Sequence, residues 1–291
     1  MTSKQSSYLD PSKVTSFNDI TSYIDDGPWL GDYAVCSMMI YSEPGEGKTP
    51  LLGTVTDCER LMPALLIDCD SGTLSIRSIT GLKTIHLDVM ADKMSVELME
   101  KASTTQERKN ASVSQWGAIE AIYNWLRLAE HEYKTIMLDG ASEIERFCEM
   151  ETISDRIDDK GREAELAELG DYRLIRNRMK RMYMRFRDIN TIDGRKINLF
   201  ATAHEGRRQE NSKIAIQPLF IGAGGPLISS TFDIIARLTR EKDDDVDPML
   251  VCKVHEQGKG RGRDRSGGIS GGVIKSPTMS KIADAIWGES K

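Results

Sequence analysis

The stretch from Ser42 to Pro50 contains the residue types that hold a chain of phosphates. It reads S-E-P-G-E-G-K-T-P, which departs from the phosphate-loop pattern G-x-x-x-x-G-K-[ST] only at the first position, where serine replaces glycine. In that pattern the backbone N–H groups surround the phosphates, the lysine reaches the β- and γ-phosphates, and the hydroxyl binds Mg²⁺. We therefore expect ATP and Mg²⁺ as cofactors. The expected contact residues are Glu43, Pro44, Gly45, Glu46, Gly47, Lys48, Thr49 and Pro50.

A phosphate loop requires a strand before it and a helix after it, because the turn and the helix N-terminus together direct N–H groups at the anion. The apolar run at 33–41 predicts the strand, and the sequence after Thr49 predicts the helix. Pro50 is tolerated there, since proline lacks only an N–H that the first helical turn does not use. The alternative, a surface turn that happens to contain G-E-G-K-T, does not account for this context.

A second acidic side chain is expected at the same edge of the fold. Asp139 ends the apolar segment at 134–140, and α/β sheets place their chemistry at the carboxyl ends of their strands. An aspartate there can hold the Mg²⁺ shell, or it can cap the next helix. Together with the loop, the metal role is favoured, and we expect Thr49 and Asp139 to bind Mg²⁺.

The elements that must position these residues alternate along the chain. Apolar, strand-like segments lie at 33–41, 64–70, 83–88, 134–140, 196–204, 231–241 and 248–256. Segments with helical periodicity lie at 114–132 and about 142–188, and the polar stretch 91–115 is expected to be a mobile excursion. This alternation predicts an α/β fold with a mostly parallel sheet covered by helices. The last two strands, on either side of the acidic loop 241–247, predict a C-terminal β-hairpin.

Composition limits the class of protein. The net charge is 39 − 45 = −6, but it is segregated: seven basic residues and no acid lie between Tyr172 and Arg187. Those arginines could be a solvated face, a subunit contact or phosphate contacts. Five scattered cysteines without C-x-x-C spacing favour reduced thiols over a zinc site or disulfides. No apolar run is long enough to span a bilayer, so we expect a cytoplasmic protein without membrane contact. Residues 1–30 are expected to be a short lead-in, and 31–291 a single core domain.

The order of these segments resembles the RecA core, and the resemblance spans most of the chain. The segment L-L-I-D-C-D at 65–70 resembles the family's strand that ends in the glutamate activating the attacking water, and Asp70 takes that place. The segment N-L-F-A-T-A-H at 198–204 is similar to the strand that ends in the γ-phosphate sensor, and His204 takes the sensor's place. Residues 260–268 resemble a segment whose basic residues reach the neighbouring subunit's nucleotide. That likeness implies a trans-acting role for Arg263 and Arg265.

Each of these positions also has a simpler interpretation. His204 could be a histidine at the rim of the core, and Asp70 could cap a helix or bind metal. Arg263 and Arg265 could belong to a solvated basic loop, although a flexible loop with guanidinium groups is also what an arginine finger needs. Asp70 is one methylene shorter than the family's glutamate, which implies slower hydrolysis or a differently oriented water.

The best candidate for nucleic-acid contact is segment 205–225, which follows the expected sensor strand. As a mobile loop with cations and one aromatic residue, it could follow a single strand electrostatically. The candidate DNA-binding residues are Arg207, Arg208, Lys213 and Phe220.

The resemblance is greatest to the short RecA-like ATPases of bacteriophages. It implies an ATPase that binds single-stranded DNA, assembles head-to-tail as a filament or ring, and promotes annealing or strand pairing in recombination. A single-strand-binding protein would be a further partner, and the bacterial cytoplasm the compartment. Two alternatives stay open: a nucleotide-gated DNA-binding scaffold with little hydrolysis, and a ring-forming helicase or loader ATPase.

Overall fold

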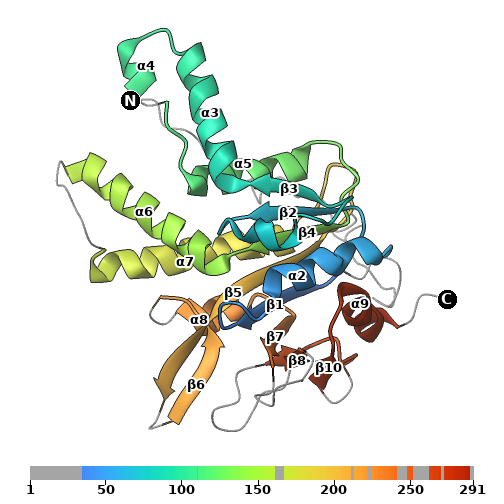
Figure 1. Ribbon diagram of the computed structural model, residues 1–291. Coiled ribbons are helices and arrows are strands. Elements are labelled where there is room, and N and C mark those ends of the chain that lie inside the picture. Colours follow the sequence, from blue (N-terminus) through green and yellow to red (C-terminus); the bar gives the residue numbers. More distant parts are fainter. Residues whose placement is uncertain are drawn as a thin grey trace, which may run out of the picture. The chain divides into compact units, whose positions relative to one another are not determined.

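The computed structural model describes residues 35–109, 111–160, 167–210, 213–221, 224–240, 248–251, 262–269 and 272–288. The expected lead-in at 1–30 and the acidic loop at 241–247 lie outside these ranges. Within them the strands form a ten-stranded sheet in the order β10-β8-β7-β1-β5-β4-β2-β3, with β6 paired to β5 and β9 paired to β7 (Figure 1). None of the described helices is both long and apolar enough to cross a membrane.

The centre of the sheet is parallel. Its strands are β7 (Ile234–Thr239), β1 (Ser37–Ser42), β5 (Asn198–Glu210), β4 (Thr135–Asp139), β2 (Ala64–Asp68) and β3 (Lys83–His86). Every residue of β1, β2 and β4 is buried, as expected of parallel strands that are covered on both faces. The predicted α/β fold with a mostly parallel sheet is therefore confirmed.

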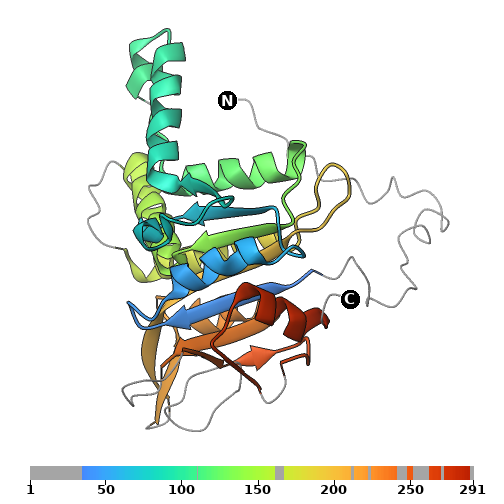
Figure 2. The same ribbon diagram turned by 45° about the vertical axis from the view of Figure 1, so that its right-hand side comes forward.

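Helices cover both faces of this sheet (Figures 1 and 2). On one face Met39 and Tyr41 of β1 share a core with α5 (Gln115–Leu128), α6 (Ala141–Lys160) and α7 (Leu169–Arg187). On the other face Met38 and Ile40 share a core with α2 (Lys48–Gly53) and α9 (Met279–Trp287). Short 3-10 turns at Thr54–Asp57 and Gly72–Ile76 complete the second face. The alternation along β1 thus divides the helices into two layers.

Antiparallel strands extend the sheet beyond β7. Strand β8 (Met249–Val251) pairs antiparallel with β7, which confirms the predicted C-terminal hairpin. Strand β10 (Val273–Lys275) pairs antiparallel with β8. The two-residue strand β9 (Arg263–Asp264) also pairs antiparallel with β7. Arg263 therefore lies in a strand, although the glycine-rich sequence around it predicted a loop.

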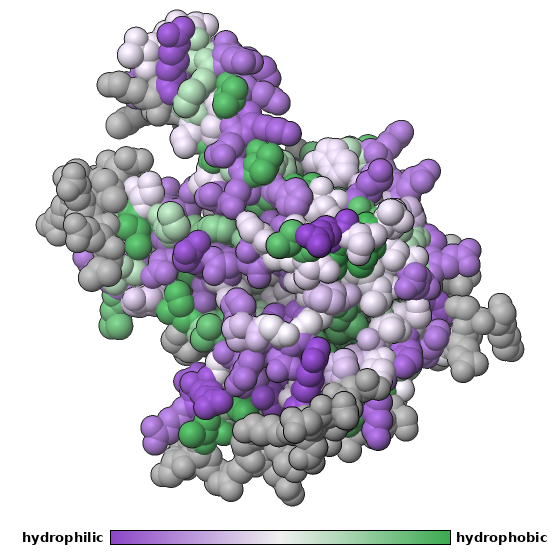
Figure 3. Space-filling model, in the orientation of Figure 1, coloured by the Kyte–Doolittle hydropathy of each residue, from purple (hydrophilic) through white to green (hydrophobic). Residues whose placement is uncertain are grey.

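Most of the described stretch 91–115, where the sequence predicted a mobile excursion, is helical. It includes most of α3 (Leu87–Lys101) and all of α4 (Thr105–Lys109), which project from the sheet as an arm (Figure 2). Val96, Leu98 and Met99 on this arm have exposed fractions of 53%, 46% and 50%, and hydrophobic residues are visible on it in Figure 3. The sequence lacked a helical apolar stripe here because the outer half of the arm packs against little of the rest of the chain.

The described residues of segment 205–225 form regular elements where the sequence predicted a mobile loop. Strand β5 continues through Glu210 and pairs with β6 (Lys213–Pro218), from Glu205 opposite Pro218 to Glu210 opposite Lys213. Helix α8 (Gly224–Ser229) follows. Most of the described residues of this segment therefore lie in a hairpin.

A buried carboxylate fastens the end of this hairpin to the helical layer. Glu145 on α6 is 4% exposed, and its Oε2 accepts a hydrogen bond from the Ile221 N–H at 2.7 Å. Burial raises the pKa of Glu145 to about 7, because a charged carboxylate loses its hydration there. The Ile221 N–H opposes this shift only in part.

This pKa makes stability dependent on pH. Between the ordinary glutamate pKa of 4.5 and about 7, Glu145 carries a proton in the folded chain but not in the unfolded chain. The free energy of unfolding therefore decreases as the pH rises through this range. We expect Glu145→Gln to raise the free energy of unfolding at pH 8 by up to about 3 kcal/mol and to change it little near pH 4. Thermal melting at both pH values measures the effect. The exposed control Glu97→Gln should change neither value, and an equal effect of Glu145→Gln at both would contradict the assignment.

Candidate functional site

The loop between β1 and α2 is open toward solvent at its glycines. Gly45 and Gly47 have φ values of 84° and 95°, a left-handed conformation that favours glycine. A Cβ added at either residue would meet no heavy atom within 4 Å. Gly47 is the N-cap of α2, and Lys48 and Thr49 form the first helical turn. The predicted strand–loop–helix arrangement is present, with free space in front of the backbone.

The unexpected serine at the start of the loop contacts the lysine at its end. Lys48 Nζ donates to Ser42 Oγ at 3.0 Å and lies 3.3 Å from the carbonyl oxygens of Ser42 and Glu43. Burial lowers the pKa of Lys48, while Asp139 and Asp70 oppose that shift. A glycine at position 42 could not provide the hydroxyl acceptor. Ser42, the residue that departs from the phosphate-loop pattern, therefore supplies one of the oxygen atoms around the Lys48 ammonium group.

A buried carboxylate lies beside the first turn of α2. Thr49 Oγ1 donates to Asp139 Oδ2 at 2.7 Å, and Asp139 is 1% exposed at the end of β4. Burial raises the pKa of Asp139, and hydrogen bonds from Thr202 and Thr49 oppose the shift. The sequence predicted that Thr49 and Asp139 share a site, and the structure brings them into direct contact.

Sequence reasoning missed Thr202. Its Oγ1 donates to Asp139 Oδ1 at 2.5 Å and accepts from the Gly140 N–H at 3.0 Å. Thr202 lies in β5, which the sheet order inserts between β1 and β4. The polar residue within an apolar strand was a signal, but only the strand order shows that it faces Asp139.

These residues fit a magnesium nucleotide. The loop offers backbone N–H groups beside open space, and Lys48 is held by exchangeable contacts with three oxygen atoms. A hydroxyl and a carboxylate, 2.7 Å apart, form a hard oxygen donor pair of the kind that Mg²⁺ prefers alongside phosphate oxygens. Lys48, Thr49 and Asp139 would hold the phosphates and the metal ion.

Asp70 lies at the same edge, next to Asp139. A Cβ added at Gly140 would lie 3.2 Å from Asp70 Cβ, and one added at Gly72 would lie 3.4 Å from Thr49 Oγ1. Asp70 Oδ1 accepts from the Gly72 N–H at 3.0 Å. Partial burial raises the pKa of Asp70, and the Gly72 bond and Lys48 lower it. Its position next to the Thr49–Asp139 contact is compatible with the predicted role at the attacking water.

His204 directly neighbours the first residue of the loop in the sheet. Its Cα partner in the β1–β5 register is Ser42. His204 Nδ1 is buried and has no hydrogen-bond partner among the described residues. Burial and the charge of Lys48 lower the pKa of His204, so the imidazole is neutral at pH 7. It lines a hollow of about 480 Å³ together with Asp70, Glu143 and Arg146. An unpartnered ring nitrogen beside the loop can receive a ligand.

Both acidic side chains of the loop contact arginines of neighbouring strands. Glu43 Oε1 lies 3.3 Å from Arg207 on the extension of β5, and Glu46 Oε2 lies 3.8 Å from Arg240 just after β7. Arg207 on the β5–β6 hairpin therefore reaches the loop, Arg208 follows it in β5, and Lys213 begins β6. The structure thus joins the expected nucleotide site to the expected nucleic-acid segment.

The expected contribution of Phe220 to nucleic-acid contact is wrong in this structure. Phe220 is 6% exposed and belongs to the core that includes Ile216 and Ile228. Its ring cannot stack on a base because it is packed under α8. The sequence placed it in a loop, where an aromatic residue would have been accessible.

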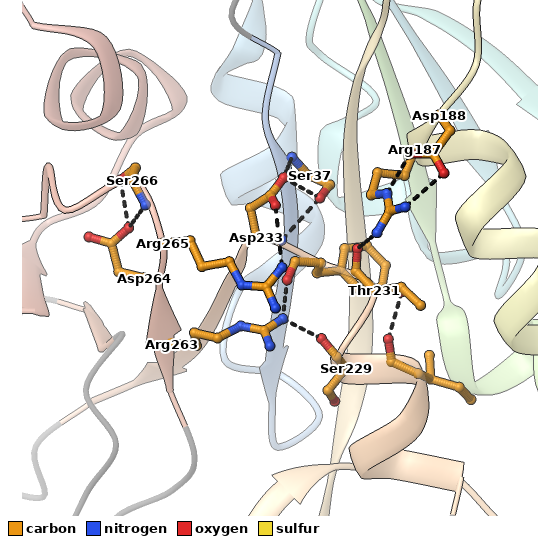
Figure 4. Close-up of polar contacts among 12 residues, drawn as sticks. Ser37, Arg187, Asp188, Ser229, Thr231, Asp233, Arg263, Asp264, Arg265 and Ser266 are labelled. Atoms are coloured by element: carbon orange, nitrogen blue, oxygen red, sulfur yellow. Dashed lines mark hydrogen bonds and ion pairs between the residues drawn. The ribbon is translucent and has the colours of Figure 1, made fainter. Parts of the chain in front are cut away.

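Arg263 and Arg265 lie beside the first residues of β7, at the opposite ends of the parallel strands from the phosphate loop. Figure 4 shows both arginines next to Asp233 and Ser37. Arg263 donates to the carbonyl oxygens of Ser229, at 2.6 Å, and Phe232, so it braces the turn between α8 and β7. Arg265 Nη1 is 3.9 Å from Asp233 Oδ1, and its side chain is 53% exposed. Asp233 is itself held by Ser37 Oγ at 2.6 Å. Arg265 is thus the more accessible of the two.

Comparison with known proteins places the chain in a family. A family model described as "AAA domain" matches residues 35–266, which is most of the chain. The RadB recombinase is similar in structure at 12% identity and a TM-score of 0.37, covering 78% of this chain and 82% of that one. The flagellar accessory protein FlaH from Methanocaldococcus jannaschii is similar at 12% identity and a TM-score of 0.32, covering 79% and 81%. No curated protein matches the chain.

The role of Thr202 can be tested separately from the fold. Thr202→Val keeps the shape of the side chain but removes the hydrogen bond to Asp139 and the acceptor for the Gly140 N–H. We expect about a tenfold rise in the Mg²⁺ concentration needed for half-maximal nucleotide binding, equivalent to about 1.4 kcal/mol, as measured by equilibrium binding of a labelled ATP analogue. Thr202→Ser retains the hydroxyl and should restore the wild-type value. Equal Mg²⁺ dependence of the valine and serine variants would refute the role.

Proposed function

The chain belongs to the AAA domain family, and on that premise we propose that it binds ATP with Mg²⁺ at the loop between β1 and α2 and hydrolyses it. The observation that carries the proposal is the contact of Thr49 Oγ1 with the buried Asp139 carboxylate, 2.7 Å apart. A helix-terminal hydroxyl and a strand-terminal carboxylate are brought together beside Lys48. Such a pair is what a nucleotide-bound Mg²⁺ requires.

Each residue at this edge has a definite part in the proposed reaction. Lys48 would leave its contacts with Ser42 and Glu43 and bind phosphate oxygens instead, and Thr49 and Asp139 would hold the metal ion. The γ-phosphoryl group of ATP would be transferred to water, with ADP as the leaving group. Asp70 accepts the proton of that water, and its partial burial brings its pKa closer to neutral, which favours proton acceptance. Neutral His204 can donate its ring N–H to a phosphate oxygen.

We further propose that hydrolysis is coupled to single-stranded DNA through β5. This strand runs without interruption from Thr202, which contacts Asp139, to Arg207 and Arg208 on the hairpin. Arg207 also contacts Glu43 in the loop. Phosphates bound beside Glu43 would repel its carboxylate and so weaken this ion pair, and the freed guanidinium would be available to nucleic acid.

The proposed biological role is annealing or strand pairing during recombination, in a bacteriophage that acts in the host cytoplasm. The active form would be a head-to-tail oligomer in which Arg265 of one subunit reaches the nucleotide of the next. Arg263 would stabilise the turn between α8 and β7, beside which Arg265 lies. The exposed side chain of Arg265 and the exposed apolar residues of the α3–α4 arm support such an assembly. A single-strand-binding protein would be a further partner.

A second candidate is a nucleotide-gated DNA-binding scaffold with little turnover. The observation that favours it is Asp70 itself, which has a short side chain already engaged by the Gly72 N–H at 3.0 Å. A carboxylate held by a backbone donor is a weaker base for water.

Steady-state hydrolysis of ATP separates the two candidates. We expect single-stranded DNA to stimulate turnover, and Asp70→Asn to reduce turnover by about a hundredfold while leaving nucleotide affinity unchanged, because a general base contributes to the reaction step. Asp88→Asn is the matched control, since Asp88 lines the same hollow but forms a hydrogen bond with Gln115 instead. Absence of turnover in the wild-type protein, with or without DNA, would leave only the scaffold.

A further inference from the structure

A groove that takes no part in the nucleotide site runs along the outer side of α7. It consists of two adjoining hollows of about 250 and 590 Å³, which share Tyr123, Arg181 and Arg185. Both lie between α5 and α7, in the helical layer opposite α2. The larger hollow is also lined by Asn177, Lys180 and Met184. The buried side of α7, which includes Ile175, Met179 and Phe186, faces the core, so these groove residues form its outer side.

The positive charge of this groove is not balanced within the described part of the chain. Arg178 and Arg187 on the same helix are paired, with Asp155 at 2.8 Å and with Asp188 at 2.6 Å. Lys180 and Arg181, in contrast, have no carboxylate within salt-bridge distance among the described residues. Arg185 reaches Glu120 only at 4.0 Å.

Most acidic residues of the groove line the smaller hollow, so the larger hollow has an excess of positive charge. Glu120, Glu151 and Asp155 line only the smaller hollow. The single acid that lines the larger one is Asp188, and both of its carboxylate oxygens are engaged by Arg187. A chain of net charge −6 thus keeps a local excess of cations here. Such an excess attracts an anionic ligand.

The groove also offers an aromatic face. The Arg185 guanidinium lies 5.4 Å from the centre of the Tyr123 ring, and that ring packs edge-on against Phe186 at 5.6 Å. Met184 beside it is 37% exposed. A guanidinium that lies over an aromatic ring offers its own flat, cationic plane, on which a base can stack.

We propose that this groove binds single-stranded nucleic acid, with Lys180, Arg181 and Arg185 at the phosphates and Tyr123 beside the bases. Arg181 and Arg185, four residues apart, lie about 6 Å apart along the axis of α7, and Lys180 is adjacent to Arg181, so one extended strand can contact more than one of them. A strand with regularly spaced phosphates and flat bases matches both features of the groove. An acidic peptide would match only the charges.

This inference is independent of the proposed function, because the groove lies in the helical layer opposite α2 and shares no lining residue with the hollow beside the phosphate loop. Binding here should not require nucleotide, whereas binding at the β5–β6 hairpin should depend on it. The two sites can therefore be separated by variants of each, measured with and without an ATP analogue.

The test uses the full chain and a fluorescently labelled oligothymidylate, without nucleotide, over about 50 to 200 mM salt. We expect Lys180→Gln with Arg181→Gln to weaken binding about tenfold at the lower salt and to reduce the slope of log affinity against log salt by about 1.4, since each lost phosphate contact removes about 0.7. Lys83→Gln with Lys275→Gln removes the same charge from exposed strand residues and should change neither value.

Two further variants make the outcome decisive. Lys180→Arg with Arg181→Lys keeps both charges and should bind like the wild-type protein, which separates charge from folding. Arg207→Gln with Arg208→Gln should reduce only the binding that an ATP analogue adds. Unchanged affinity and salt slope in the Lys180/Arg181 glutamine variant would overturn the proposal. The proposal would also be overturned if this glutamine variant no longer self-associated in sedimentation but still bound oligothymidylate like the wild-type protein. The groove would then be a contact between subunits.

Discussion

The hydrogen bond between Thr49 and Asp139 is the contact on which the rest of the structure depends. It joins the first turn of α2 to the end of β4 at 2.7 Å, across 90 positions of sequence. For it to form, β1 and β4 must end at the same edge of one sheet, which parallel pairing through β5 ensures. β5 also carries Thr202, which occupies the second oxygen of the carboxylate at 2.5 Å. A buried aspartate is stable here because its oxygens are hydrogen-bonded.

The continuity of β5 connects that contact to the surface. Its first half belongs to the central sheet, and its second half forms the hairpin with β6. We propose that a change in the position of His204 or Thr202 passes along this one backbone to Arg207. The Arg207–Glu43 ion pair is exposed, at 68% and 54%, so it contributes little to stability. We propose that this ion pair matters because phosphates bound beside Glu43 can break it and release Arg207.

The parts of the site that depend on local sequence pattern could be predicted from the sequence. Loop residues 43–49, the buried strands and Asp139 follow from apolar runs and from the position of polar residues at their ends. Thr202 could not be found in this way, because the order of strands in a sheet depends on pairing between distant segments. Phe220 was misplaced for the same reason: α8 covers it, and nothing in its local sequence specifies that contact. The α3–α4 arm has no apolar stripe, since its outer half packs against little.

The central claim is that the loop between β1 and α2 binds the phosphates of a nucleotide. The most direct measurement is the equilibrium binding of a labelled ATP analogue with Mg²⁺ to the wild-type chain and to Lys48→Ala, with the exposed Lys93→Ala as control. The account predicts that the wild-type and Lys93→Ala proteins bind equally, and that Lys48→Ala loses at least about a hundredfold in affinity, because a charge-assisted contact to phosphate is removed. Equal affinity of Lys48→Ala and the wild-type protein would contradict it.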